Sequence, residues 1–220
     1  MIRHYLKIAW RNLAQNKIYS VITIGSIAVG LAAFLLIFLY ISDELRFDRY
    51  HKNTDRIFRL VQHASWPGGQ FDAAITSAPF APGISTEYPE VQEATRILPE
   101  GGGIIHYKDK TISGQDIFFA DHTVFDVFSF PFLYGDRTTA LTKPQSIVLT
   151  ESLANKLFDD PRKAINQTIY FENNYPNTVT GVIKDVPTNS HIRFSALRSF
   201  SPGYTTGWQN HNLFTYLLLT

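Results

Sequence analysis

The chain has 220 residues, of which 45% are apolar and 18% charged, a composition that is globular rather than disordered. Its formal net charge of +1 combines four basic residues and no acid in positions 1–17 with 16 basic and 19 acidic residues in the rest, which excludes a uniformly basic nucleic-acid-binding domain. The absence of cysteine excludes disulfide scaffolds, zinc–thiolate sites, iron–sulfur clusters and cysteine nucleophiles.

Residues 1–17 have the pattern of a short basic amphipathic helix. The apolar residues that share one helical face are Ile2, Leu6, Ala9, Trp10 and Leu13. The basic residues of the segment are Arg3, Lys7, Arg11 and Lys17. A basic helix of this kind, with a tryptophan on its apolar face, is suited to lie on the inner leaflet of a membrane. The alternative is a positively charged flank without fixed structure.

Residues 18–42 contain no charge and predict a transmembrane helix. A helix of this length extends roughly 37 Å, which exceeds the ~30 Å hydrocarbon core of a bilayer. Tyr19 and Tyr40 bracket the stretch at positions suited to the two interfaces. A buried core helix would carry a polar stripe, and a secretory signal would have a shorter apolar region followed by a cleavage site. The sequence SDELRFDRYH follows instead.

The flanks of this helix predict its orientation and a packing face. Because basic residues precede it, the positive-inside rule places residues 1–17 in the cytoplasm and 43–220 outside. The small residues Gly25, Ser26 and Gly30 would let another helix approach closely, although glycine and serine are common in membrane helices in any case.

The remainder, 43–220, predicts a mixed domain. We expect the membrane helix to continue for some turns past residue 43 and to end at Thr54 and Asp55. Further helices are expected at 80–88, 123–130 and 151–158, the last capped by Thr150. Strands are expected at 57–61, 91–98, 104–107, 111–119, 146–149, 167–172, 178–186 and 213–219, with turns at 66–69, 101–103 and 173–177. Alternating helices and antiparallel hairpins indicate an α+β fold.

Motifs that carry chemistry are missing from the sequence. It contains no GxxxxGK[ST] phosphate loop, no GxSxG nucleophile elbow and no HExxH pair, and Ser152 and Lys156 have the wrong spacing for an SxxK motif. We therefore predict no catalytic, cofactor-binding or metal-binding residues. The phenylalanine-rich stretch 118–132 favours a local aromatic core over a ligand pocket. The stretch Gly181–His191 predicts a strand followed by a defined turn, because Asp185 and Asn189 can bond the local backbone and Pro187 fixes φ.

Several stretches in a fixed order resemble a known family. They are RNLAQNKIYSVITIGSIAVGLA, YISDELRFDRYHKNTDRIFRL, FFADHTVFDVFSFPFLYGD, SIVLTESLANKLF and VTGVIKDVPTNSHIRF. From about residue 11 to 197 the chain resembles the N-terminal part of a MacB/FtsX-like ABC transporter permease of the type abundant in Bacteroidota. The family's turn motif matches here at Gly181, Asp185, Pro187, Asn189, Ser190 and His191.

The resemblance implies a domain organisation and partners. Residues 1–17 would be a cytoplasmic amphipathic segment, 18–42 the membrane helix, and 43–220 a MacB-like periplasmic core domain in the inner membrane. Because the chain ends inside the apolar run TYLLLT, we expect this domain to be incomplete at its C-terminus, although a C-terminal edge strand is the alternative. The implied partners are a cytoplasmic ABC ATPase, the lipid bilayer, a second permease copy and a periplasmic adaptor, without nucleic acid or cofactor.

The implied function is that of a permease subunit without catalytic residues of its own. ATP hydrolysis by a separate ATPase would drive movement of the periplasmic domain for efflux or export, and the basic residues of 1–17 would serve in coupling. A membrane-anchored domain that senses a ligand outside the membrane is the alternative. A membrane-anchored enzyme is a third reading, against which the missing nucleophile and metal motifs argue.

Overall fold

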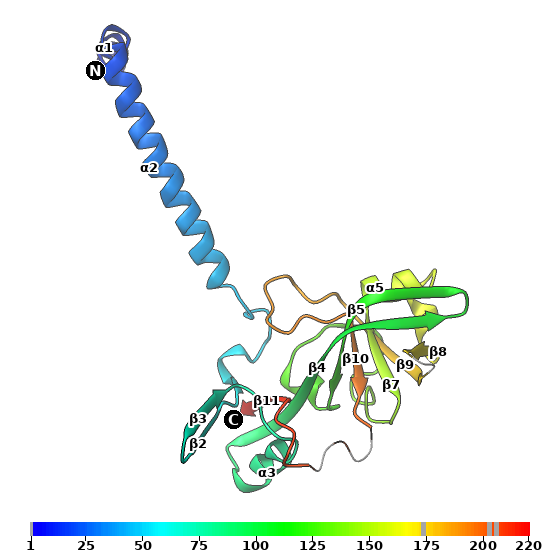
Figure 1. Cartoon of the computed structure of the whole chain (residues 1–220). Coiled ribbons are helices and arrows are strands. Elements are labelled where there is room, and N and C mark those ends of the chain that lie inside the picture. Colours follow the sequence, from blue (N-terminus) through cyan, green and yellow to red (C-terminus); the bar gives the residue numbers. More distant parts are fainter. Residues whose placement is uncertain (1, 173–174, 202–203, 205–206) are drawn as a thin grey trace. The chain divides into compact units, whose positions relative to one another are not determined.

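The computed structural model describes residues 2–172, 175–201, 204 and 207–220, and it shows a chain of two compact units, Met1–Phe47 and Asp48–Thr220 (Figure 1). The first unit consists of two helices, α1 (Ile2–Gln15) and α2 (Lys17–Glu44). Within the described residues, α2 is the one helix that is long and apolar enough to cross a membrane. The prediction of a single membrane-type helix near the N-terminus is therefore confirmed.

Two details of this helical unit differ from expectation. The sequence has neither proline nor glycine before Gly25, which predicts uninterrupted helix, yet the chain bends at Asn16 (φ −106°, ψ 61°). Beyond Glu44 the helix does not continue, and residues 45–50 form turns instead. Asp43 and Glu44 lie in the last helical turn, where the helix dipole disfavours acids, and Asp48 adopts a positive φ of 58° that is incompatible with helix.

The second unit is built on a nine-stranded sheet and a separate hairpin. The strands are β1 (Ile57–Arg59), β2 (Gln62–Trp66), β3 (Gly69–Ala73), β4 (Val91–Tyr107), β5 (Lys110–Ala120), β6 (Phe132–Gly135), β7 (Ser146–Thr150), β8 (Thr168–Phe171), β9 (Tyr175–Ile183), β10 (Ala196–Ser199) and β11 (Phe214–Leu219). The helices are α3 (Phe80–Glu87), α4 (Val124–Val127) and α5 (Glu151–Leu157), with 3-10 turns η1 (Thr54–Arg56) and η2 (Pro161–Ala164).

The large sheet closes on itself. Its strand order is β1-β11-β4-β5-β10-β7-β9-β6, and β8 pairs with both β4 and β9, so that β4, β5, β10, β7, β9 and β8 form a ring. The pairs β5–β10 and β7–β9 are parallel, while the other pairs of the ring are antiparallel. Mixed pairing together with short helices confirms the α+β fold.

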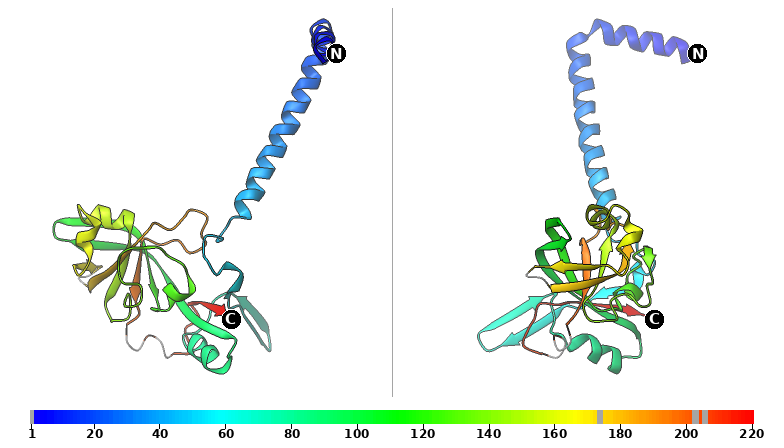
Figure 2. Two further views of the ribbon diagram at one scale, coloured as in Figure 1. Left: turned by 180° about the vertical axis from the view of Figure 1, so that it is seen from behind. Right: turned by 90° about the vertical axis from the view of Figure 1, so that its right-hand side faces the viewer.

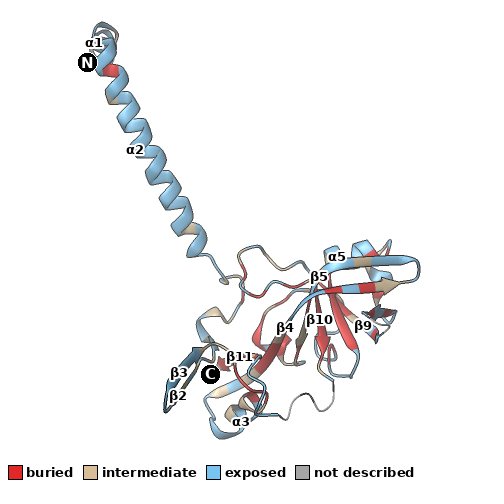
Figure 3. Cartoon of the chain, in the orientation of Figure 1, coloured by how far each residue is buried: buried red, intermediate tan, exposed pale blue. Residues whose placement is uncertain are grey.

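Two hydrophobic clusters fill this domain, and buried residues follow β4, β7 and β10 (Figure 3). One cluster joins residues of the ring strands, among them Ile105, Ile117 and Leu149, to Leu153 and Leu157 of α5. The other contains the phenylalanine-rich stretch, where Phe125 and Phe128 are each 1% exposed. The interpretation of that stretch as an aromatic core is confirmed. Its helix is shorter than expected, because the backbone turns extended at Phe128 (ψ 138°).

The longest strand passes through the three glycines that the sequence suggests as a turn. β4 runs without a break from Val91 to Tyr107, and its register with β5 shifts on both sides of Gly103. A Cβ atom at Gly103 would fall 2.2 Å from Cε2 of Phe171, so only glycine lets β8 approach at this point. The expected turn at 101–103 is wrong, because the glycines serve bulges within a strand.

Some strands were not expected. The loop expected at 66–69 is the tip of the hairpin β2–β3, which projects from the rest of the domain (Figure 2). Pro67 and Gly68 (φ 103°) form its two-residue turn, and a Pro-Gly sequence favours a type II turn. β6 and β10, with four residues each, also lie outside the strands expected from the sequence. Of the turn expected at 173–177, residues 173–174 lie outside the described residues, and residues 175–177 belong to β9 and pair with β8, so the expectation is wrong there.

Candidate functional site

The first residue of the domain, Asp48, is bound by the turn that ends the Gly181–His191 stretch. Its carboxylate accepts the backbone N–H of His191 at Oδ1 (3.0 Å) and pairs with Nδ1 of the His191 ring at Oδ2 (2.7 Å). Its own N–H donates to the carbonyl of Asn189 (2.9 Å). On its other side, the His191 ring meets the hydroxyl of Tyr216 at Nε2 (2.8 Å). We call the hydrogen bonds among Asp48, Asn189, His191 and Tyr216 the junction.

The junction fixes the tautomer of the histidine. A carboxylate can only accept, so Nδ1 of His191 carries a proton toward Asp48, and in the neutral ring Nε2 accepts the hydroxyl of Tyr216. Tyr216 is 1% exposed and belongs to β11, which lies between β1 and β4 in the sheet. Burial raises the pKa of the Tyr216 hydroxyl, so this group acts as a hydrogen-bond donor and not as a nucleophile. The Asp48–His191–Tyr216 series is therefore a tether from the start of the domain to its sheet.

Ser190 extends the same contact to the next residues of the chain. Its hydroxyl lies 3.0 Å from the Tyr50 hydroxyl and also donates to the carbonyl of Ile192 (3.2 Å). The backbone N–H of Ser190 donates to the carbonyl of Pro187 (3.2 Å), which closes the turn. Burial, the largest cause, raises the pKa of Tyr50 to about 12. The predicted turn thus exists, and it binds residues 48–50, a role that its sequence does not indicate.

His51 lies beside the junction in an aromatic cage. Its ring centroid is 3.9 Å from that of Tyr50, 4.9 Å from Phe128 and 5.3 Å from Phe130. Nδ1 accepts the backbone N–H of Ser129 (3.1 Å), so Nε2 carries the proton, and Nε2 is buried without a hydrogen-bond partner among the described residues. Burial, the dominant cause, lowers the pKa of His51 to about 4. His51 is therefore neutral at physiological pH.

The other two residues of the turn motif contact more distant parts of the chain. Asp185 accepts the backbone N–H of Ser152 (2.9 Å) and its hydroxyl (2.6 Å), and so caps α5; the expectation that it bonds the local backbone is wrong. Thr150 occupies the N-cap position but makes no side-chain cap bond, so the expected cap by Thr150 is wrong. A Cβ atom at Gly181 would lie 2.7 Å from Cε1 of Phe132, so glycine lets that ring pack on β9.

The other candidate residues belong to α1 and α2 of the helical unit. Arg3, Lys7, Arg11 and Lys17 are exposed along α1 and at the start of α2. The side chains of Ile2, Leu6 and Ala9, which belong to the expected apolar face, lie outside the described part of the chain. Gly25 and Gly30 have open space where a Cβ atom would be, and the Ser26 hydroxyl donates to the carbonyl of Ile22 (2.8 Å).

The chemistry available at the site is binding and positioning. Among the residues that the structure describes, no group of three or more His, Asp or Glu side chains could hold a metal ion. Sequence reasoning found Asn189, Ser190 and His191 but missed Asp48, His51 and Tyr216. No local pattern marks these three residues, because a single Asp or His in FDRYHK and a single Tyr in a strand each have many ordinary roles.

Comparison with known proteins agrees with this architecture. The family model described as MacB-like periplasmic core domain matches residues 20–218. The chain is similar to the crystal structure of a domain of a protein assigned as a permease from Porphyromonas gingivalis, with 25% identity, a TM-score of 0.69, and 79% of this chain and 76% of that chain covered. None of the curated proteins matches the sequence.

Two more distant structures share the fold. One is the periplasmic region of MacB from Actinobacillus actinomycetemcomitans, with 17% identity, a TM-score of 0.55, and 75% of each chain covered. The other is the extracellular domain of the ABC-type transporter YknZ from Gram-positive bacteria, with 13% identity, a TM-score of 0.50, and coverage of 74% of this chain and 81% of that chain.

Proposed function

Since the chain belongs to the MacB-like periplasmic core domain family, we propose that it is the N-terminal portion of an ABC transporter permease whose periplasmic domain moves when a separate cytoplasmic ATPase hydrolyses ATP. The movement would serve efflux or export. We divide the chain into a cytoplasmic segment 1–17, a membrane helix 18–42 and a periplasmic core domain 43–220. Its partners are the ATPase, the bilayer, a second permease copy and a periplasmic adaptor.

The observation that carries this proposal is the junction. Asp48 follows the last residue of α2, Glu44, by only four positions, and it is held by three hydrogen bonds to Asn189 and His191. Through Tyr216 the tether continues into β11, which pairs with β1 and β4. A displacement of Asp48 would therefore be passed through His191 and Tyr216 to the sheet, which supports a mechanical role for the domain.

The orientation of the membrane helix is part of the proposal and is tested with reporter fusions. Because the positive-inside rule places the basic segment in the cytoplasm, alkaline phosphatase joined after Thr220 should be active, since this enzyme folds only in the periplasm. A cytoplasmic reporter at the same position is the control and should be inactive. The reverse pattern of activities would place residues 43–220 in the cytoplasm and contradict the proposal.

The basic amphipathic helix α1 is proposed to couple the ATPase to the membrane helix. Arg3, Lys7 and Arg11 would meet lipid phosphates or acidic residues of the ATPase, each charge contributing about 1 kcal/mol to surface binding. We expect Leu6→Asp together with Leu13→Asp to leave membrane insertion intact but to abolish the permease-dependent part of ATP turnover, because acids on the apolar face lift it from the leaflet.

The measurement is ATP turnover in proteoliposomes that contain the full-length permease and the ABC ATPase that co-purifies with it. Asn12→Asp is the matched control, since it adds an acid to the polar face of the same helix and should preserve turnover. If the double variant keeps wild-type turnover as well, α1 is only a topology signal. If no ABC ATPase associates with the wild-type permease, the proposed function itself fails.

A further inference from the structure

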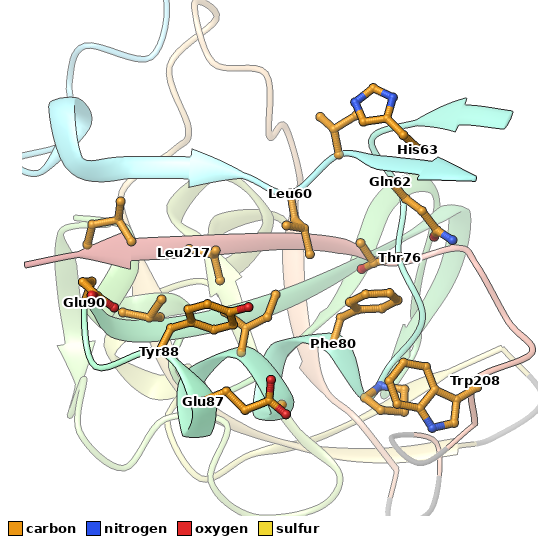
Figure 4. A pocket seen from close by; sticks show the side chains of 16 residues that line it. Leu60, Gln62, His63, Thr76, Phe80, Glu87, Tyr88, Glu90, Trp208 and Leu217 are labelled. Carbon is orange, nitrogen blue, oxygen red and sulfur yellow. The ribbon is translucent and has the colours of Figure 1, made fainter. Parts of the chain in front are cut away.

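The domain has a large hollow beside its outermost strands that the junction does not use. Its volume is about 790 Å³, which lies in the range of small-molecule sites. It is lined by the β1–β2 connection and the start of β2, by α3 and the residues that flank it up to the start of β4, by β11 and by Trp208. Figure 4 shows Leu60, Phe80, Tyr88 and Leu217 turned toward this common space. We call it the α3 hollow.

The walls of the α3 hollow expose large apolar side chains that a folded domain usually covers. Trp208 is 61% exposed, Tyr88 54% and Val61 47%. The rings of Phe80 and Trp208 meet edge to face with centroids 5.4 Å apart, which forms an aromatic corner of the hollow. Single exposed apolar residues are ordinary, but several around one concave site indicate a binding surface.

The charges at the α3 hollow all have one sign. Glu87 and Glu90 line it, and no lysine or arginine does. Within the described part of the chain, neither carboxylate forms an ion pair. The one lining residue that could become positively charged is His63, and its ring is already paired with the carboxylate of Asp72 (2.8 Å). The hollow therefore offers apolar contact and uncompensated negative charge, and its aromatic corner can hold a cation against a ring face.

We propose that the α3 hollow binds a hydrophobic organic cation. Leu217, Ile84 and Phe80 would contact its apolar body, while Glu87 and Glu90 would stand near its positive charge. A neutral apolar molecule would leave both carboxylates without a partner, and an anion would be repelled by them. This binding is a property of the domain and goes beyond the proposed transport function, on which it does not depend.

The test compares two ions of nearly equal size and opposite charge. Labelled tetraphenylphosphonium and tetraphenylborate are dialysed against the full chain in lipid nanodiscs, with empty nanodiscs as the blank for partition into lipid. We expect saturable binding of the cation at one site per chain and no saturable binding of the anion. Equal binding of both ions, or binding of neither, would overturn the proposal, whatever the outcome of the turnover experiments with the ATPase.

Substitutions then locate the site. We expect Glu87→Gln with Glu90→Gln to weaken cation binding about tenfold, as the loss of two exposed charges predicts. Gly83 lines the hollow, and a Cβ atom built there has no neighbour within 4 Å, so a side chain can begin at this position without a clash. Gly83→Lys should reduce affinity at least about tenfold, while the uncharged Gly83→Gln of similar length should change it little.

Melting temperatures of these variants, compared with wild type, confirm that each is folded. Asp109→Asn with Asp159→Asn is the control for charge removal elsewhere, because neither residue lines the α3 hollow and both are exposed. An affinity that falls equally in the control and in the Glu87/Glu90 variant would mean that the cation responds to the overall charge of the domain, which would also overturn the proposal.

Discussion

Replacing Phe128 with alanine is expected to lower the free energy of unfolding of the Asp48–Thr220 unit by about 3–5 kcal/mol, the usual cost of removing a buried ring. The side chain is 1% exposed. Its ring centroid lies 4.9 Å from that of His51, 5.1 Å from Tyr216 and 5.8 Å from Phe130. Because these neighbours come from three different parts of the chain, the cavity cannot be filled by a local shift.

The measurement is denaturant unfolding of the full chain in nanodiscs, followed by a signal from the domain. Phe58→Ala is the matched control, because Phe58 is 51% exposed at the edge strand β1 and its loss should cost less than about 1 kcal/mol. A change of under about 1 kcal/mol for Phe128→Ala would mean that the cluster can collapse around the missing ring. A ligand pocket would then be the better description of the phenylalanine-rich stretch.

The parts of the fold that the sequence predicts are those with a local cause. The membrane helix follows from 25 residues without a charge, and the aromatic core from the density of phenylalanines in 118–132. The hairpin β4–β5 was recognised at its tip, Tyr107 to Lys110. The bulges at Gly103 could not be predicted, because glycine is required there by the ring of Phe171, which lies on a strand far along the chain.

Only the turn of the site could be predicted, again because only the turn has a local cause in the sequence. The turn at Pro187–Ser190 has local chemistry and could be read from its residues. The residue that this turn binds, Asp48, lies 143 positions from His191 in the sequence. Tyr216, the other partner of His191, lies 25 positions from it, on strand β11. Neither pairing leaves a pattern in one sequence, since a single Asp in FDRYHK and a single Tyr in a strand each have many ordinary roles. The fold brings them together.

The buried His51 makes the stability of the domain sensitive to acid. Its pKa is about 4 in the folded domain, against the ordinary 6.5, and burial is the main cause. The nearby charge of Asp48 opposes this lowering of the pKa, and His191 adds to it. At a pH between these values the unfolded chain binds a proton that the folded domain does not. Stability must therefore fall as the pH is lowered from about 6.5 to about 4, and this contribution is level outside that window.

We expect this one histidine to cost the domain about 3 kcal/mol between pH 7 and pH 4, since each pKa unit corresponds to about 1.4 kcal/mol. The free energy of unfolding is measured at both pH values for wild type and for His51→Gln, whose amide can still accept the Ser129 N–H but does not titrate. The difference in pH dependence between the two proteins gives the contribution of His51 alone, because protonation of the carboxylates in acid lowers the free energy of unfolding of both. His122→Gln, at an exposed position, is the control and should follow wild type.

Parallel pH dependences for wild type and His51→Gln would mean that the folded domain binds the proton as readily as the unfolded chain. The cage of Tyr50, Phe128 and Phe130 would then open to water in solution, and the tether between Asp48 and the sheet would be looser than its hydrogen bonds imply.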